Sequence, residues 1–153
     1  FNVAGAEESL RIGECHEPET HLIPLAIKAA LGKKSDIKIY GDDYETKDGT
    51  CIRDYVHVMD LADGHIAMIK DSRMQKGLKV YNFGTGKGSS VLEVIKAFEK
   101  QTGIFIPFKF TKRRKGDVAA SFCNPKKALK ELNWKTRYTL NQAFMDIKIF
   151  ENS

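Results

Sequence analysis

The chain has 153 residues, of which 42% are hydrophobic and 29% charged, as is ordinary for a globular protein with one buried core. No apolar run approaches the roughly 18 residues that a membrane-spanning helix needs and no signal-peptide pattern opens the chain, so we expect a soluble, cytoplasmic protein. The formal net charge of +5 comes mainly from scattered lysines and is compatible with an anionic ligand.

The chain opens on Phe-Asn-Val, which is typical of a strand, and continues directly into Gly5. A strand at the first residue suggests a chain cut inside a domain. A polar loop is expected from Glu14 to Thr20. A helix is predicted from His21 to Leu31, because Pro24 is tolerated in a first helical turn and Gly32 stands just past the end.

The stretch from Gly41 to His65 is dense in turn residues, aromatic residues and histidines. It follows a short apolar run, Ile37 to Tyr40, that predicts a strand, and it contains a turn at Asp48-Gly49. Branched and aromatic residues then predict a brief extended segment, and Asp60 is expected to cap the helix that follows it. A bare scaffold does not need this combination of residues, so we expect a ligand site here.

A glycine-rich loop, Gly84 to Gly88, lies between a predicted strand, Lys79 to Phe83, and a predicted helix. Ser90 and Glu93 form the signature of a capping box at the start of that helix. The spacing is not the G-x-G-x-x-G of dinucleotide-binding loops, because Ser89 occupies the third site. Two interpretations stay open: a dinucleotide site, or a tight turn whose helix N-terminus faces a ligand.

The last third of the chain predicts one more strand and two helices. Residues Ile104 to Phe110 are typical of a strand and lead into a basic turn, Lys112 to Asp117. A helix is predicted to begin at Asn124-Pro125, and a final helix near Thr139. The alternation of short strands and helices predicts an α/β fold.

The three cysteines, Cys15, Cys51 and Cys123, are odd in number and widely spaced. They therefore predict reduced thiols rather than a disulfide framework or a zinc site. A metal pair at Cys15-His16 is the weaker alternative, because adjacent side chains diverge in an extended chain.

Six segments resemble the substrate-domain signature of UDP-glucose (UDP-galactose) 4-epimerases, which are extended short-chain dehydrogenases/reductases. They are FNVAGA (1–6), HEPETHLIP (16–24), GDDYETKDGTCIRDYVHVMDLADGH (41–65), YNFGTGKGSSVLEV (81–94), RRKGD (113–117) and ELNW (131–134). The order and spacing of the segments make the resemblance specific, and together they extend over essentially all of the chain.

The resemblance implies that residues 1–153 are the C-terminal, UDP-sugar-binding part of an NAD-dependent UDP-glucose/UDP-galactose 4-epimerase of galactose metabolism. The N-terminal half, with the NAD-binding Rossmann sheet and the catalytic residues, would be absent from this chain. In agreement, no tyrosine has a lysine four places further on. The fragment alone is thus expected to be inactive, and the full-length parent to be a homodimer with no metal, membrane or nucleic-acid partner.

Two alternatives to this function stay open. The parent could be an epimerase of another UDP-sugar, such as a uronate or a pentose, because the expected anchor recognises UDP better than it recognises the hexose. The basic run Lys112 to Lys115 could instead mark a small nucleic-acid-binding module, although it lacks a known recognition element.

Three residues are expected by resemblance to hold the nucleotide. Arg53 and Arg114 match positions that hold the pyrophosphate, and a guanidinium fits phosphate oxygens in a fixed geometry. Asp117 resembles the carboxylate that accepts hydrogen bonds from the ribose hydroxyls. The plain alternatives are an ion pair of Arg53 with Asp54 or another acid, a solvated basic turn at Arg114, and a turn-stabilising role for Asp117.

Further residues match positions that line the substrate pocket. The strand residues Lys38, Ile39 and Tyr40 match the place of the uracil, although Ile39 and Tyr40 alone would simply be core. Ser121 matches a position in the sugar pocket, where a small side chain leaves room for an N-acetyl group. The other matching residues are Asn2, His21, Leu22, Tyr55 and Val91, with His21-Leu22 standing where some members carry Asn-Leu beside the phosphates; His57 and His65 are interpreted as structural.

Overall fold

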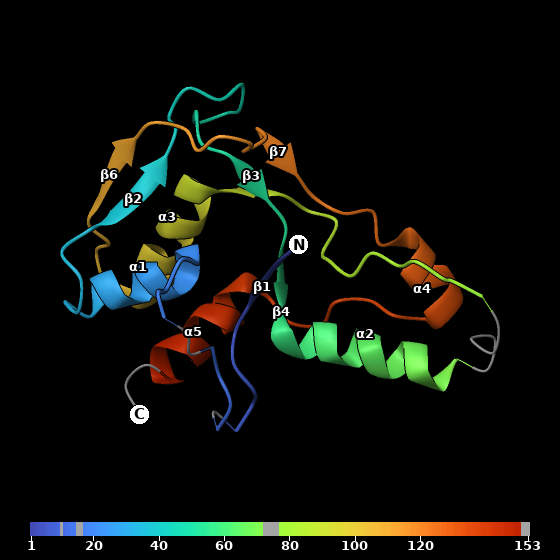
Figure 1. The fold of residues 1–153 in the computed structure, drawn as a ribbon. Helices are drawn as coiled ribbons and strands as arrows, with labels where there is room; N and C mark the ends of the chain where they lie inside the picture. The colour runs from blue at the N-terminus through green and yellow to red at the C-terminus, as the bar shows by residue number, and fades with distance from the viewer. Residues whose placement is uncertain (10, 15–16, 72–76, 151–153) are drawn as a thin grey trace.

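The computed structural model describes residues 1–9, 11–14, 17–71 and 77–150 (Figure 1). The strands are β1 (Asn2–Ala4), β2 (Ile37–Tyr40), β3 (Ile52–Arg53), β4 (Tyr55–His57), β5 (Ser89–Ser90), β6 (Phe108–Thr111) and β7 (Ala120–Ser121). The helices are α1 (Leu22–Ala30), α2 (Val58–Lys70), α3 (Val91–Thr102), α4 (Lys126–Leu132) and α5 (Leu140–Phe150). None of these described helices combines the length and apolar character that crossing a membrane requires.

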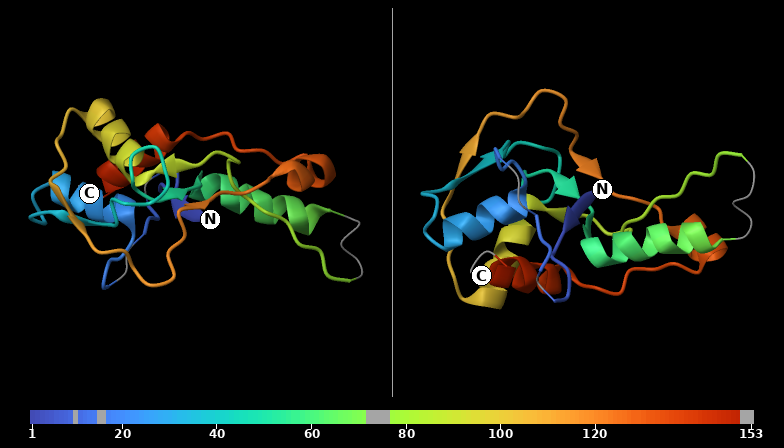
Figure 2. Two further views of the ribbon diagram at one scale, coloured as in Figure 1. Left: turned by 90° about the horizontal axis from the view of Figure 1, so that it is seen from above. Right: turned by 60° about the horizontal axis from the view of Figure 1, so that its bottom comes forward.

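The strands form three small sheets, and the predicted α/β fold is confirmed. β1 pairs with β4 and β2 pairs with β6, both in parallel. In the third sheet β3 lies between β5, which is antiparallel to it, and β7, which is parallel. Helices α1, α3 and α5 gather near the β2–β6 pair, whereas α2 and α4 lie together at the opposite end (Figures 1 and 2).

The main hydrophobic core lies where α1, α3 and α5 meet β2. Phe98 of α3 and Phe144 of α5 are both at most 2% exposed, and their rings meet edge to face at 5.5 Å between centroids. Ile27 of α1 and Ile39 of β2 complete this packing. The core therefore fixes β2 against three helices.

The signals predicted for the two helices in this region are confirmed. α1 begins at Leu22 after His21, and Gly32 follows its end with φ +71°. α3 carries the full capping box, in which the Ser90 hydroxyl accepts from the Glu93 N–H at 3.0 Å and the Glu93 carboxylate accepts from the Ser90 N–H at 3.0 Å.

The prediction that Asp60 caps α2 is wrong. The helix begins two residues earlier, and the ring of His57 accepts from the N–H of Met59 at 3.1 Å. The buried Asp60 carboxylate instead accepts from the N–H groups of Arg137, at 2.8 Å, and Tyr138, at 3.1 Å. His57 Nε2 lies 2.8 Å from Asp146, so the structural role predicted for this histidine is confirmed.

Two predicted strands differ from the structure. Residues 79–83 form no strand, because this segment is held by side chains: Tyr81 donates to Glu131 at 2.8 Å and Phe83 packs edge to face on Trp134 at 4.7 Å. The strand expected from Ile104 starts only at Phe108. The reason is that the N–H of Ile106 donates to the Glu99 carboxylate at 2.9 Å instead of joining a sheet.

Candidate functional site

One cavity of about 780 Å³ gathers segments that are far apart in the sequence. Its wall comes from β1, the N-terminal end of α1, β2, the junction of β3 with β4, the first residue of α3 and the loop after β6. Eleven of the twelve expected binding residues line it: Asn2, His21, Leu22, Lys38, Ile39, Tyr40, Arg53, Tyr55, Val91, Arg114 and Asp117. The fold therefore brings residues from separate motifs to one place.

Arg53 is anchored in the wall of this cavity. Its Nη1 donates to the carbonyls of Ile52, at 2.8 Å, and Val118, at 2.9 Å, and its Nη2 lies 3.4 Å from the Asp117 carboxylate. Among the described residues these contacts occupy three of the five N–H groups of the guanidinium. The remaining donors are available to an anion in the cavity. The alternative of an ion pair with Asp54 or another acid is confirmed in its second form, because the acid that pairs with Arg53 is Asp117 rather than Asp54.

Arg114 reaches the same cavity from the loop after β6. Its guanidinium carbon lies 3.9 Å from the centre of the Tyr40 ring, a distance at which a cation is attracted to the ring face. Among the described residues, no carboxylate forms an ion pair with Arg114. The neighbouring Arg113 is different, because its Nε lies 2.6 Å from Asp43 and its guanidinium lies over the Tyr44 ring. Two adjacent arginines thus have separate roles, one paired and one facing the cavity.

Asp117 and Ser121 occupy the opposite ends of a short segment that leads into β7. The N–H of Asp117 donates to the carbonyl of Arg114 at 3.3 Å across Gly116, whose φ is +90°, so Asp117 closes a turn and also lines the cavity. Ser121 is the one expected residue that does not line this cavity. It pairs with Arg53 in register but lies on the edge strand and is exposed.

β2 presents backbone groups to the cavity. The N–H groups of Ile37 and Gly41 donate to carbonyls on the β6 side, at 3.0 and 2.8 Å. Backbone direction alternates along a strand, so Lys38 and Tyr40 point their N–H and C=O groups the other way, toward the edge that lines the cavity. The Ile39 side chain is only 2% exposed and belongs to the core. An edge of this kind offers paired donors and acceptors to a flat polar ring.

The remaining expected residues lie around the rim and floor. Tyr55 and Val91 are buried, and burial raises the pKa of Tyr55 well above its ordinary value, so its hydroxyl stays protonated and can donate. Asn2 is held through its own N–H, which donates to the carbonyl of Asp54 at 2.8 Å. His21 and Leu22 stand at the start of α1.

The glycine-rich loop is not arranged as a phosphate cradle. The N–H groups of Thr85 and Gly86, both 2.9 Å from the Asp54 carboxylate, donate to that buried side chain. A Cβ added to Gly84 would approach Cys123 and Asp54 within 3 Å. The loop is therefore a tight turn closed on Asp54, and the dinucleotide interpretation does not fit it.

Some residues of the cavity were not expected. Leu25 follows Leu22 by three positions, so helical spacing could have indicated it. Cys51 was interpreted only as a reduced thiol; it is a free thiol in the cavity wall, and burial raises its pKa. Lys109 and Asp36, paired at 2.9 Å, are brought to the rim by the pairing of β2 with β6, which no local signal gave. Cys15 and His16, considered above as a metal pair, lie outside the described residues.

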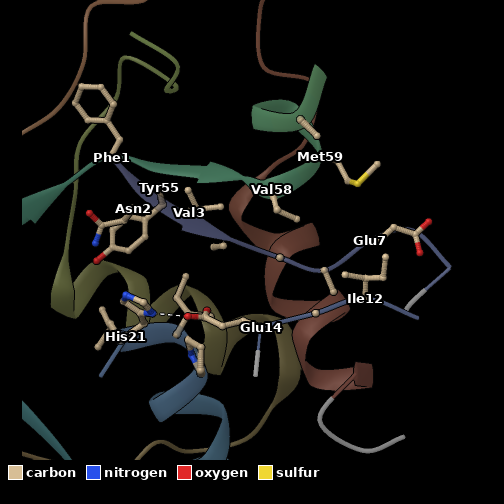
Figure 3. Close-up of a pocket in the computed structure, with 18 residues that line it drawn as sticks. Phe1, Asn2, Val3, Glu7, Ile12, Glu14, His21, Tyr55, Val58 and Met59 are labelled. Carbon is tan, nitrogen blue, oxygen red and sulfur yellow. Dashed lines mark hydrogen bonds and ion pairs between the residues drawn. The ribbon is translucent and has the colours of Figure 1, made fainter. Parts of the chain in front are cut away.

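A second cavity of about 710 Å³ lies on the other side of the start of α1 (Figure 3). Its lining is mostly apolar and includes Val3, Ile12, Val58 and Met59. His21 lines both cavities. The segment before α1 therefore forms part of the partition between them.

The chain is similar to known proteins. The family model described as GDP-mannose 4,6 dehydratase matches residues 2–147. Among curated proteins, the UDP-glucose 4-epimerase of Bifidobacterium longum is 49% identical over 144 residues, which are 92% of this chain and 42% of that protein. The chain thus spans less than half the length of this relative.

Solved structures agree with the sequence comparison. A UDP-glucose 4-epimerase from Bifidobacterium longum in complex with NAD⁺ and UDP has a TM-score of 0.94 and 45% identity, with 99% of this chain and 45% of that chain covered. A UDP-glucose 4-epimerase from Stenotrophomonas maltophila, with bound NAD and formylated UDP-arabinopyranose, has a TM-score of 0.94 and 42% identity, with 99% and 46% covered. The α/β fold described above is therefore that of part of these enzymes.

Proposed function

The chain belongs to the family described as GDP-mannose 4,6 dehydratase, and on that premise we propose that it is the UDP-sugar-binding part of an NAD-dependent UDP-glucose 4-epimerase. The observation that carries the proposal is the single cavity lined by Arg53, Arg114, Asp117 and the edge of β2. The similarity to UDP-glucose 4-epimerases over more than nine-tenths of the chain supports it. We place the whole enzyme in the cytoplasm.

The diphosphate would bind between the two arginines. Arg53 is fixed by two carbonyls and still has N–H groups to donate, and Arg114 is held on the face of Tyr40. Hydrogen bonds from a guanidinium to phosphate are charge-assisted and can be bidentate. Asp117, beside Arg53, would accept from the ribose hydroxyls, so one ion pair joins the phosphate site to the ribose site.

The uracil would lie along the edge of β2. The backbone groups of Lys38 and Tyr40 that point away from β6 present both donors and acceptors, which a uracil ring needs. Side chains contribute little hydrogen bonding here, because Ile39 is core and Tyr40 is engaged with Arg114.

The anchor leaves the sugar to react elsewhere. NAD would take hydride from the sugar and return it, but the glycine-rich loop of this chain does not fit an NAD pyrophosphate, because its N–H groups donate to Asp54. We propose that NAD is held by the part of the relatives that this chain does not span. Contacts with UDP lie far from the reacting carbon of the sugar. Their binding energy can offset the cost of orienting the sugar for reaction.

The first strand indicates where that other part would pack. β1 belongs to a parallel pair, and among the described residues its second edge has no strand partner. Purely parallel sheets occur almost only where both faces are covered by other elements. A sheet of only two strands is marginally stable by itself. Phe1 is 49% exposed and Val3 is 42% exposed beside this edge. We propose that the NAD-binding part, and with it the contacts of a homodimer, would complete this sheet.

Titration of the 153-residue chain with UDP, followed by calorimetry, tests the proposed site. Arg114→Ala should weaken UDP binding by about 10- to 100-fold, because a charge-assisted contact contributes roughly 1.5–3 kcal/mol. Arg113→Ala is the matched control. It removes the same charge at the adjacent position, but the Arg113 side chain is paired with Asp43. Equal losses in both variants would contradict the proposal. The same titration with an oligonucleotide tests the alternative of a nucleic-acid-binding module.

Sugar specificity is a separate question from UDP binding. An epimerase of another UDP-sugar is the second candidate, and the observation in its favour is the formylated UDP-arabinopyranose bound to a relative that is 42% identical. A panel of UDP-hexoses, UDP-uronates and UDP-pentoses on the full-length protein separates the candidates. Ser121 lies outside the cavity lining of this chain, and we propose that it lines the sugar pocket of the full-length protein. Its small side chain would leave room there for an N-acetyl group, and so for both UDP-hexoses and UDP-N-acetylhexosamines. Ser121→Tyr should then remove activity on UDP-N-acetylgalactosamine while keeping activity on UDP-galactose.

A further inference from the structure

The segment before α1 holds a cluster of side chains that the proposed function does not use together. Glu14, Glu19 and His21 each offer one ligand atom, and the three atoms all lie within 4.8 Å of one another. His21 Nδ1 contacts the carboxylate of Glu14 (Figure 3). The same nitrogen lies 3.7 Å from the carboxylate of Glu19. The cluster stands in the partition between the two cavities, because His21 lines both of them.

The separations are close to those that a metal ion needs: His21 Nδ1 and the Glu14 carboxylate are in hydrogen-bonding contact, and the three ligand atoms lie within 4.8 Å of one another. Metal bonds to imidazole nitrogen and carboxylate oxygen are about 2.0–2.2 Å long, so two ligand atoms of one ion can be no more than roughly 4.4 Å apart. Small rotations of the Glu14 and His21 side chains would bring all three atoms into that range. The proton that His21 Nδ1 shares with Glu14 would leave, because a metal-bound nitrogen cannot carry it.

One ligand of the cluster is already fixed. The Glu19 carboxylate is 7% exposed and accepts from the N–H groups of Thr20, at 2.7 Å, and His21, at 2.8 Å. The imidazole of His21 is 62% exposed, and Glu14 lies between these extremes at 25%. The Glu19 side chain is thus buried and oriented, whereas Glu14 and His21 are more accessible. An ion can therefore enter the site from solvent. The site also keeps coordination positions open.

We propose that Glu14, Glu19 and His21 bind a divalent transition-metal ion such as Zn²⁺ or Mn²⁺. One imidazole and two carboxylates favour such an ion over Mg²⁺ or Ca²⁺, which prefer oxygen ligands alone. Three protein ligands leave at least one position for water or for an oxygen of a molecule in either cavity.

Zinc titration of the 153-residue chain, followed by calorimetry, tests the site. Cys15 and His16 directly follow Glu14 in the sequence and are themselves strong ligands. The parent for the test is therefore the Cys15→Ser, His16→Asn double variant. It should bind one Zn²⁺ per chain, seen as a saturable heat of binding with a stoichiometry near one. Failure of this parent to bind zinc would overturn the proposal.

Single changes in that parent identify the ligands. His21→Asn and Glu19→Gln should each weaken zinc binding by at least tenfold, and Glu14→Gln should weaken it and remove the rise in melting temperature that zinc gives the parent. His65→Asn is the matched control, because His65 is another exposed histidine whose Nδ1 contacts only the carbonyl of Leu61 within the described residues. Unchanged zinc affinity in His21→Asn, or an equal loss in His65→Asn, would show that the ion binds elsewhere. These readouts do not involve UDP, so they stand apart from the test of the proposed function.

Discussion

At the scale of single residues, the buried carboxylate of Asp54 joins three segments that lie far apart in the sequence. It is 1% exposed and accepts from the N–H and hydroxyl of Thr85, at 2.9 and 2.6 Å, from the N–H of Gly86, at 2.9 Å, and from the N–H of Cys123, at 3.2 Å. Asp54 follows Arg53 directly. The geometry of the arginine that faces the cavity therefore depends on this neighbouring carboxylate.

Asp54→Asn should lower the free energy of unfolding by about 2–3 kcal/mol, measured by urea denaturation. The amide that replaces one oxygen is a donor facing donors, so it leaves buried N–H groups without an acceptor, which costs roughly 1–3 kcal/mol for each group. Asp42→Asn is the control, because Asp42 is exposed and its substitution should change stability by less than about 0.5 kcal/mol. Equal effects of the two changes would contradict the role assigned to Asp54.

The same carboxylate gives stability a pH dependence. Burial alone would raise the pKa of Asp54, but the hydrogen bonds from Thr85 and from two further backbone N–H groups hold the pKa below its ordinary value. The unfolded state therefore binds protons first as the pH falls. The stabilisation is complete above the unfolded pKa, near 4, and is lost as the pH falls through the lower folded pKa. Urea denaturation between pH 3 and 6 should show this loss in the natural chain and a smaller loss in Asp54→Asn.

The sequence predicted which residues gather in the cavity better than it predicted how they are held. Arg53, Arg114 and Asp117 follow from local motifs and their family resemblance, and all three line one cavity. The partners of Asp54 lie 31 to 69 residues away, and those of Asp60 lie 77 and 78 residues away. Local propensity carries no information on such contacts, which is why Asp60 was expected to cap its own helix.

At the scale of elements, the start of α3 combines a local signal with a distant contact. The capping box of Ser90 and Glu93 was predicted from the sequence and is confirmed. The Ser90 hydroxyl also donates to Asp48, which in turn accepts from Thr50. The cap thereby fixes the 41–50 loop to the helix whose first residue, Val91, lines the cavity.

Ser90→Ala should destabilise the chain by about 1–2 kcal/mol, because it removes the acceptor for the Glu93 N–H and leaves Asp48 with one fewer donor. Ser89→Ala is the matched control: the residue precedes the cap, and among the described residues its hydroxyl has no recorded hydrogen bond. Thermal unfolding followed by circular dichroism measures both. An equal fall in melting temperature in Ser90→Ala and Ser89→Ala would contradict the role assigned to the cap.

Helices were predicted more reliably than strands for a physical reason. α1 and α3 carry their own stop and start signals, so their ends could be inferred locally. A strand requires a partner, and residues 79–83 have a strand-like composition but are held by Tyr81 and Phe83 side chains. The pairing of β2 with β6 joins segments about 70 residues apart, so the Lys109–Asp36 rim could not be inferred from either strand alone.

At the scale of the whole molecule, the three small sheets and the edge of β1, which has no strand partner among the described residues, suit the proposed role of a unit that binds UDP without carrying out redox chemistry. The cavity offers two arginines and a backbone edge to a nucleotide diphosphate. The N–H groups of the glycine-rich loop, which could otherwise have received a dinucleotide, already donate to Asp54. The architecture thus fits the proposed separation of substrate anchoring from the chemistry.

The 153-residue chain should therefore bind UDP yet show no detectable NAD binding and no interconversion of UDP-glucose and UDP-galactose. Two calorimetric titrations of one sample, with UDP and then with NAD, separate these expectations, and a coupled assay for UDP-glucose measures turnover. Because UDP binding verifies that the chain is folded, a missing NAD signal cannot then be attributed to unfolding. NAD affinity comparable to that for UDP, or turnover by the pure chain, would mean that the cofactor site lies within residues 1–153 and that the proposed division between the two parts is wrong.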